Sequence, residues 1–249
     1  MRAFTTAGYG ALLTAFSDAG YEAVDLEALD AGRRHVFLRH DVDFSPEYCA
    51  PIARAEIDVG YRSTFYFLVT SPFYNILDPA VRDDLRRLSA LGHAIGLHFD
   101  ASLYPEGPQL EEQAERERML LESVADAPVR SISFHRPAPS LVGRPGHFAG
   151  RPHTYQPQFV EAIAYYSDSQ GAWRFGHPLD SEAFARAAAM QLLTHPIWWC
   201  IDVEETPTAR LNRWLGHRLE QQVADVGRNC KSYDPSLIER RAPGAGRAG

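Results

Sequence analysis

Ionisable side chains follow five short apolar segments of this chain, at positions where buried strands would end. They are Asp41 and Asp43, His98, His135 with Arg136, Asp168, and His195. Together they supply oxygen and nitrogen ligands for a metal, a base, an acid and a cation that can position a carboxylate, which is what metal-assisted hydrolysis requires. The ordered set therefore predicts hydrolytic chemistry at a metal centre.

The first group is an Asp-x-Asp sequence, Asp41 and Asp43. In an extended chain, alternate side chains share one face, so the two carboxylates would lie about 6 to 7 Å apart along a strand. Two carboxylates on one face repel unless a cation or a shared proton relieves them, which favours a metal ligand beside a base. The alternative is that one aspartate caps a helix beginning at Pro46.

The histidines and the arginine differ in how well they fit a metal site. His98 ends its apolar segment and is the better ligand, whereas His93 precedes that segment and fits a turn or a helix C-terminus. A single histidine at such a place is also common as a packed core residue. Arg136 can pair with a carboxylate at the site or form a surface ion pair.

The elements that must position these residues alternate along the chain. Candidate strands are residues 36–38, 65–69, 94–97, 132–134 and 192–193, and candidate helices are 46–59, 79–91, 109–125 and 181–190. Ser45 and Pro46 are a typical N-cap and first turn for the helix at 46. Further helices are expected over 7–20 and 207–226. Such alternation favours βα units around a buried parallel sheet or barrel, whose C-terminal face would carry the chemistry.

Composition excludes several classes of protein. The 249 residues are 45% hydrophobic and 23% charged, which is typical of one large globular domain. A formal net charge of −7 argues against nucleic acid as a partner. Cys49, Cys200 and Cys230 form no CxxC pair and are expected to be reduced thiols. No leader-like or 18-residue apolar segment is present, so we expect a cytoplasmic protein without a membrane span.

The ordered strand ends resemble the polysaccharide deacetylase family of carbohydrate esterases, the NodB-homology domain, over roughly residues 35–200. The resemblance implies an α/β fold, a distorted (β/α) barrel with about seven strands. On this basis residues 1–34 are a helical extension packed on the barrel, 35–233 are the catalytic barrel, and 234–249 are a flexible tail. The proline- and glycine-rich stretch 137–157 would be one long loop over a face of the barrel.

The resemblance also assigns roles to individual residues. Asp41 corresponds to the catalytic base, and Asp43 and His98 to metal ligands. Arg136 corresponds to the arginine that orients the catalytic aspartate, and His195 to the general acid. Asp168 and Trp173 correspond to the motif that lines the substrate pocket.

One position departs from the family pattern. The second metal-binding histidine, expected four residues after His98, is replaced by Ser102. The third ligand is therefore open, and the candidates are Asp100, His135 and two histidines of the long loop, His147 and His153.

The expected function is a metal-dependent deacetylase that hydrolyses an N-acetyl amide on a sugar or polysaccharide precursor. The expected cofactor is a divalent metal, with Zn²⁺ favoured by the histidine ligand. Partners would be an N-acetylated sugar or a related small amide, and homo-oligomers are compatible with the sequence. The alternatives are an amidohydrolase acting on a non-sugar C–N bond and a catalytically silent carbohydrate-binding barrel.

Overall fold

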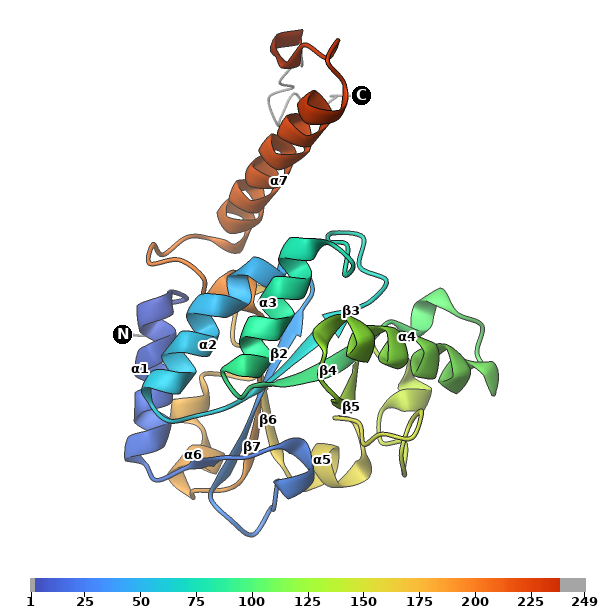
Figure 1. The fold of residues 1–249 in the computed structure, drawn as a ribbon. Helices are drawn as coiled ribbons and strands as arrows, with labels where there is room; N and C mark the ends of the chain where they lie inside the picture. The colour runs from blue at the N-terminus through green and yellow to red at the C-terminus, as the bar shows by residue number, and fades with distance from the viewer. Residues whose placement is uncertain (1–2, 238–249) are drawn as a thin grey trace, which may run out of the picture. The chain divides into compact units, whose positions relative to one another are not determined.

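A parallel β-sheet forms the centre of the molecule (Figure 1). The computed structural model describes residues 3–237. Its seven strands are β1 (Glu22–Ala23), β2 (His35–Val42), β3 (Thr64–Leu68), β4 (Ala94–Phe99), β5 (Val129–Phe134), β6 (Ala164–Ser167) and β7 (Met190–Thr194). The strand order is β5-β4-β3-β2-β7-β6, with β1 paired to β2, and every pair is parallel. The predicted α/β class and strand number are confirmed.

The sheet path ends at β5 and β6, and a loop segment extends it at the β5 end. His153 forms a parallel bridge with Ile132 of β5. The Ile132 amide donates to the carbonyl of Pro152, and the Thr154 amide donates to the carbonyl of Ile132, both at 3.0 Å. This segment belongs to the long loop predicted over 137–157. It brings the next residue, Tyr155, toward the interior of the curved sheet.

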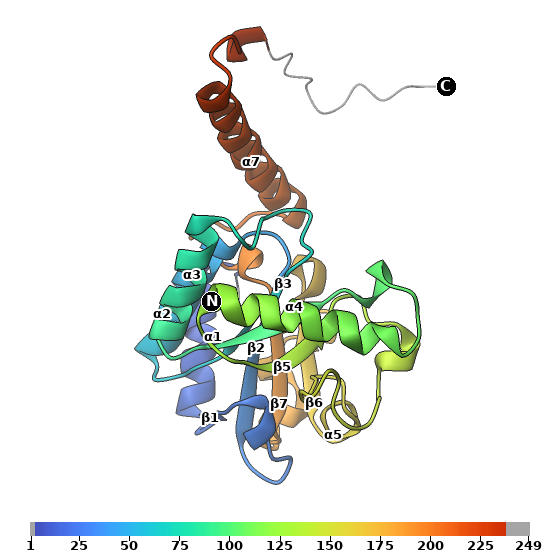
Figure 2. The same cartoon turned by 45° about the vertical axis from the view of Figure 1, so that its right-hand side comes forward.

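The helices α1 (Thr6–Asp18), α2 (Cys49–Asp58), α3 (Pro79–Ala90) and α4 (Gln109–Ala125) cover the outer side of the sheet (Figures 1 and 2). The other described α-helices are α5 (Pro157–Glu161), α6 (Glu182–Ala185) and α7 (Pro207–Asn229). Short 3₁₀ helices are Leu26–Ala28, Pro46–Tyr48, Ala101–Leu103, Pro139–Leu141, Ser169–Gly171, Pro178–Asp180, Pro196–Trp198 and Pro235–Leu237. α1, α2, α3 and α4 are successive neighbours, and α4 lies against β4 and β5. This layer keeps the sheet's outer face dry, as parallel strands require.

Local sequence explains where most helices begin. At the start of α1, the Thr5 hydroxyl accepts a hydrogen bond from the Gly8 amide. At the start of α3, the carboxylate of Asp78, the residue before Pro79, accepts from the Ala80 amide. Ser45 lies at the N-cap position with Pro46 in the first turn, as predicted, but its hydroxyl donates to Glu47 and makes no capping bond, and the first turn, Pro46–Tyr48, is 3₁₀. α2 then runs from Cys49.

One predicted helix is much shorter in the structure. The helix predicted over 181–190 is only Glu182–Ala185, because Ala187 has a positive φ of 55° and Met190 already pairs with β2 and β6. The two-residue β1 was not predicted, and β6 was expected only as the segment ahead of Asp168, with no range among the candidate strands. β6 was difficult to recognise because three of its four residues are only half-buried, which weakens the apolar pattern.

β2 is the central strand of the fold. Every residue from His35 to Val42 is buried, since α1 and α2 cover one face and the interior of the curved sheet covers the other. Inside, Phe37 and Tyr66 belong to an apolar cluster with Leu26, Phe159, Ile163 and Ala189. A strand buried on both faces holds its register firmly, because a slip would expose one of them.

The chain divides into two compact units, Met1–Glu204 and Glu205–Gly249. α1 lies in the first unit, beside α2, and the second unit contains α7. The predicted catalytic domain of residues 35–233 includes α7, whereas in the structure this helix belongs to the second unit. Most of the predicted tail, residues 238–249, lies outside the described residues.

Two further expectations concern the cysteines and the membrane. Cys49, Cys200 and Cys230 are free thiols, as predicted. Among the described helices, none has the length and apolar character needed to cross a bilayer.

Candidate metal centre and active site

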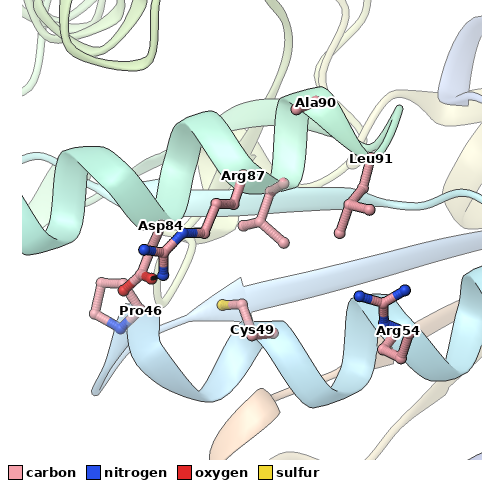
Figure 3. A pocket seen from close by; sticks show the side chains of 9 residues that line it. Pro46, Cys49, Arg54, Asp84, Arg87, Ala90 and Leu91 are labelled. Carbon is pink, nitrogen blue, oxygen red and sulfur yellow. Dashed lines mark hydrogen bonds and ion pairs between the residues drawn. The ribbon is translucent and has the colours of Figure 1, made fainter.

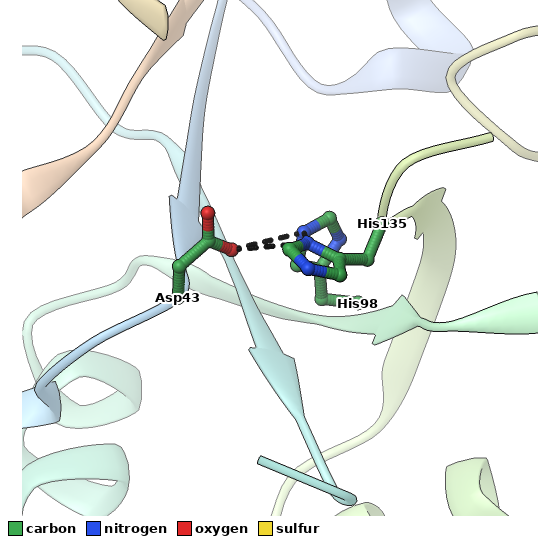
Figure 4. Close-up of side chains that lie close together, drawn as sticks. All are labelled: Asp43, His98 and His135. Atoms are coloured by element: carbon green, nitrogen blue, oxygen red, sulfur yellow. Dashed lines mark hydrogen bonds and ion pairs between the residues drawn. The ribbon is translucent and has the colours of Figure 1, made fainter. Parts of the chain in front are cut away.

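Three strand ends bring potential metal ligands together at the C-terminal edge of the sheet (Figure 4). Asp43 follows β2, His98 lies in β4, and His135 follows β5. One ligand atom from each residue lies within 4.8 Å of the other two. Nε2 of His98 is 3.2 Å from Oδ1 of Asp43, and Nδ1 of His135 is 3.4 Å from the same oxygen. We call this group the metal-ligand cluster.

The ligand atoms of this cluster face one another and could hold a cation. Nδ1 of His98 lies 3.3 Å from the carbonyl of Ser133, which can only accept, so the lone pair of Nε2 faces the cluster. Oδ1 of Asp43 is buried yet accepts no hydrogen bond among the described residues. Nδ1 of His135 lies 3.1 Å from Nε2 of His98, so without a metal a proton of His135 can bridge the two imidazoles, and a bound metal would take its place. Two imidazoles and one carboxylate are a donor set that suits Zn²⁺ with an open fourth position.

Four candidates for the third ligand were left open by the sequence, and the structure places them differently. Asp100 is occupied by hydrogen bonds from Ser102 and Arg136. His147 is exposed on the long loop, and His153 is buried beside β5. Only His135, of these candidates, joins Asp43 and His98 in the cluster.

Electrostatics keep the carboxylate of Asp43 ionised. Burial by itself raises the pKa of Asp43, but the imidazoles of His135 and His98 and the charge of His195 outweigh burial. The resulting pKa lies well below the usual range of an aspartate. The cluster therefore presents a negative oxygen to a cation at neutral pH.

Asp41 lies beside the cluster and is held by Arg39. Nε and Nη2 of Arg39 donate to the two carboxylate oxygens at 2.9 and 2.7 Å, and the hydroxyl of Ser133 lies 3.4 Å from both. Burial raises the pKa of Asp41, but the guanidinium charge and the nearby His98 lower it below its ordinary value. Oδ2 of Asp41 is 3.6 Å from Nε2 of His98, so an ionised carboxylate adjoins the metal-ligand cluster.

The prediction that Arg136 orients Asp41 is corrected by this geometry. The Arg136 side chain is 72% exposed, and its Nη2 donates to Asp100 at 2.8 Å. Its positive φ of 48° turns the chain outward directly after His135. Arg39 contacts Asp41 instead, and the alternation that grouped Asp41 with Asp43 also includes Arg39, two residues earlier.

Arg39 is itself fixed inside the curved sheet. Its Nη1 donates to the Thr154 hydroxyl at 3.0 Å, and Nη2 contacts the hydroxyls of Ser133 and Tyr155. The guanidinium also lies 5.2 Å from the ring centroid of Tyr155. The long loop thus completes the surroundings of a fully buried arginine, and this role of the loop was not expected from its composition.

His195 forms a tight pair with Asp168 on the other side of the cluster. Its Nδ1 lies 2.6 Å from Oδ1 of Asp168, which also accepts from the His195 backbone amide. Burial lowers the pKa of His195, but the charge and hydrogen bond of Asp168 outweigh it and raise the pKa to about 9. Nε2 of His195 remains directed toward Asp43, 3.8 Å from Oδ2.

Asp168 lies differently from its predicted position in the substrate pocket. The residue is fully buried, and its Oδ2 accepts from the indole of Trp199 at 2.6 Å as well as from the His195 amide. Its oxygens are thus committed to protein donors, and the role that fits this geometry is to orient His195.

Trp173, the other predicted substrate-binding residue, is half-buried near this pair. Its ring lies 5.9 Å from that of Trp199 and 5.7 Å from that of His177. Its indole nitrogen is buried with no hydrogen-bond partner among the described residues. A donor left in this state is available to a ligand, so a substrate-binding role for Trp173 stays a prediction.

A cavity between α2 and α3 lies apart from these groups (Figure 3). It has a volume of about 320 Å³ and is lined by Pro46, Cys49, Ala50, Arg54, Asp84, Arg87, Leu88, Ala90 and Leu91. None of the metal-ligand cluster, Asp41 or His195 lines it. We therefore place the candidate active site at the C-terminal edge of the sheet.

Comparison with known proteins gives similarity only at the level of solved structures. No family model and no curated protein matches the chain. A family 4 carbohydrate esterase from Bacillus anthracis aligns at 14% identity over 85% of this chain and 86% of its own, with a TM-score of 0.44. The chitin deacetylase of the fungal pathogen Colletotrichum lindemuthianum aligns at 15% identity over 79% and 86%, with a TM-score of 0.45.

A family 4 pseudoenzyme from Bacillus anthracis is also similar. It aligns at 12% identity over 77% of this chain, with a TM-score of 0.38. The alignment spans 63% of that protein, less than two thirds of its length. At these levels of similarity, the chemistry is argued only from the geometry described above.

Proposed function

We propose that this protein is a metal-dependent deacetylase that hydrolyses an N-acetyl amide on a sugar or polysaccharide precursor. The observation that carries the proposal is the convergence of Asp43, His98 and His135, flanked by an ionised carboxylate and a protonated imidazole. A base and an acid on either side of a cation site are the parts that amide hydrolysis needs.

Asp43, His98 and His135 would hold a divalent metal, with Zn²⁺ favoured by the two imidazoles. When bound, such an ion supplies Lewis acidity that polarises a carbonyl and lowers the pKa of a water molecule. The hydrogen bond from Nδ1 of His98 to the Ser133 carbonyl fixes the ligating face of that imidazole.

Asp41 serves as the general base in this proposal. Arg39 holds it ionised and fixes both of its oxygens, so it is ready to accept a proton from the attacking water. Bulk water does not compete for the hydrogen bonds between Arg39 and Asp41, because Arg39 is fully buried and Asp41 is nearly so. General base catalysis of this kind contributes about 10² to 10⁴ in rate.

His195 serves as the general acid. Its pKa of about 9 keeps it protonated at neutral pH, and Asp168 fixes Nδ1 so that Nε2 carries the transferable proton toward the site. Donation of that proton to the departing nitrogen lets the C–N bond break without expelling an amide anion. Hydrolysis then yields acetate and the free amine of the sugar.

The test begins with metal binding and continues with turnover. Chelator-treated protein is titrated with Zn²⁺ by calorimetry beside Asp43→Ala, with Asp58→Ala of the exposed face of α2 as the control. One-to-one binding that is lost only in Asp43→Ala is expected. The metal-loaded protein is then assayed for acetate release from N-acetylated sugars, and a chelator should abolish that release.

Other outcomes point to the alternatives. Metal binding with hydrolysis of cyclic amides but not of N-acetylated sugars would support an amidohydrolase acting on a non-sugar C–N bond. Absence of metal binding in the unmodified protein would overturn the proposal and favour a silent carbohydrate-binding barrel. The cytoplasmic location, the exclusion of nucleic acid and the formation of homo-oligomers stay predictions.

A further inference from the structure

A second cluster of buried polar side chains lies on the face of β2 opposite the metal-ligand cluster. Its centre is Glu56 of α2, which has no exposed surface. Oε1 of Glu56 accepts from the Tyr9 hydroxyl at 2.6 Å and from Nε2 of His40 at 2.7 Å. Oε2 accepts from the Ser63 hydroxyl at 2.6 Å. We call these four residues the outer-face cluster.

The cluster reaches β7 through the second nitrogen of His40. Nδ1 of His40 lies 2.7 Å from the hydroxyl of Thr194. The two residues are direct partners in the register of β2 with β7. A side-chain hydrogen bond therefore reinforces the backbone pairing at one rung of the ladder, and each partner immediately precedes a residue of the active site, Asp41 or His195.

The charge of Glu56 makes this connection strong. Burial by itself raises the pKa of Glu56, but the imidazoles of His40 and His93 and the Ser63 hydroxyl bring it below its ordinary value. Hydrogen bonds to an ionised group are roughly twice as strong as those between neutral groups. Water does not reach this site, so removing one of the hydrogen-bonding groups leaves its partner atom unsatisfied. That loss destabilises the fold.

Aromatic packing fixes the orientation of the imidazole. The His40 ring stacks on Phe65 of β3 at 4.4 Å between centroids and 29° between planes. The Tyr9 ring meets it edge-on at 6.0 Å. With both ring nitrogens bonded and both sides packed, His40 links α1, α2, β2 and β7 in one arrangement.

We propose that Glu56, His40 and Thr194 are positioning residues that hold the ends of β2 and β7 in the register that places Asp41 and His195 on either side of the metal-ligand cluster. The inference rests on the proposed function of that site. A displacement of about 1 Å of a reacting group costs about 10²-fold in rate, so small changes of register have large effects.

The experiment uses an isosteric change at Thr194 in the metal-loaded full chain. Thr194→Val keeps the shape and removes the hydroxyl, whereas Thr194→Ser keeps the hydroxyl. We expect Thr194→Val to lower kcat for N,N′-diacetylchitobiose by about tenfold with KM unchanged, and Thr194→Ser to restore most of kcat. Tyr61→Phe is the matched control, because it removes a buried hydroxyl that donates to the Tyr21 carbonyl at 2.8 Å.

A spectroscopic measurement keeps the inference testable without a substrate. The hydrogen-bonded Nδ1 proton of His195 should give a downfield ¹H resonance, because its bond to Asp168 is short. We expect this resonance to shift in Thr194→Val and to stay in place in Thr194→Ser and Tyr61→Phe.

The outcomes separate the two proposals. If Thr194→Val loses stability as Tyr61→Phe does but keeps both kcat and the His195 resonance, the cluster is merely structural and the inference is overturned. If the unmodified protein releases no acetate, the proposed function fails, and the His195 resonance alone decides whether the cluster positions that residue.

Discussion

The two faces of β2 carry ionisable clusters that differ in how their polar atoms are satisfied. On the outer face, the carboxylate of Glu56 accepts three hydrogen bonds in a site closed to water. On the inner face, Oδ1 of Asp43 faces two imidazoles yet accepts no hydrogen bond from any described residue, and the side chain is 18% exposed. Alternation along β2 and the residue after it directs His40 to the outer face and Asp41 and Asp43 to the inner face.

The difference distinguishes a cluster that stabilises the fold from one that binds a ligand. The buried carboxylate of Glu56 is satisfied by the donors around it. Oδ1 of Asp43 accepts no hydrogen bond from the described residues and lies in a partly open site, where a ligand can supply the missing interaction. We therefore expect changes on the outer face to act first on stability and geometry, and changes on the inner face to act on metal binding and chemistry.

The largest effect is expected from Asp41→Asn on the inner face. An amide cannot accept the proton of the attacking water, so kcat should fall by about 10² to 10⁴. The metal ligands are untouched, and the affinity for Zn²⁺ should stay within about threefold of the original, by the same calorimetric titration. Equal turnover by the variant and the original protein would sink the assignment of the base.

The two faces can be compared directly by neutralising one carboxylate on each, Glu56 or Asp43, and measuring the free energy of unfolding. Glu56→Gln should destabilise the metal-free protein by about 1.5 to 3 kcal/mol, because buried hydrogen bonds to an ionised acceptor are lost. Asp43→Asn in the metal-free protein should destabilise it less than Glu56→Gln, because Oδ1 of Asp43 accepts no hydrogen bond among the described residues and only the charge interaction with the nearby imidazoles is lost. Urea unfolding of both variants measures this, and equal destabilisation would contradict the distinction.

The third ligand can be tested by His135→Ala. We expect the Kd for Zn²⁺ to rise by more than about 100-fold, because one of three protein ligands is lost. His147→Ala, on the exposed part of the long loop, serves as the control and should bind as before. Tight binding by His135→Ala would mean that another group completes the site.

A smaller effect on kcat is expected when Arg39 or Arg136 is replaced by lysine. Arg39→Lys removes the two-point contact with Asp41, which a lysine cannot reproduce, and should lower kcat about tenfold. Arg136→Lys should change kcat by less than about threefold, because Arg136 contacts Asp100 and is exposed. Steady-state kinetics of the two variants decide between them, and the reverse ranking would restore the family-based assignment.

The smallest expected effect concerns the alkaline limit of activity. His195 must be protonated to act as the acid, so activity should fall as the pH rises through its pKa of about 9. Asp168→Asn removes the charge that raises this pKa, and the alkaline limb of the pH profile should move down by about one pH unit or more. A limb that stays near pH 9 in this variant would show that His195 is not the group responsible.

Local patterns in the sequence were sufficient for the fold class and for part of the site. Alternation of apolar segments and helices indicated the parallel sheet, because crossover helices must cover its faces. Alternation within one strand put Asp41 and Asp43 on the same side. The position of His98 and His195 at strand ends indicated that they would meet at one edge.

The contacts between strands were decided only by the tertiary structure. Whether Arg39 or Arg136 contacts Asp41, which histidine joins Asp43 and His98, and which residue pairs with Asp168 all depend on which strands are neighbours and on the path of the chain after each strand. These pairings join residues far apart in sequence, and no local propensity encodes them. The outer-face cluster was missed for the same reason: Glu56 and Thr194 are ordinary residues of a helix and a strand until β2 and β7 come into register.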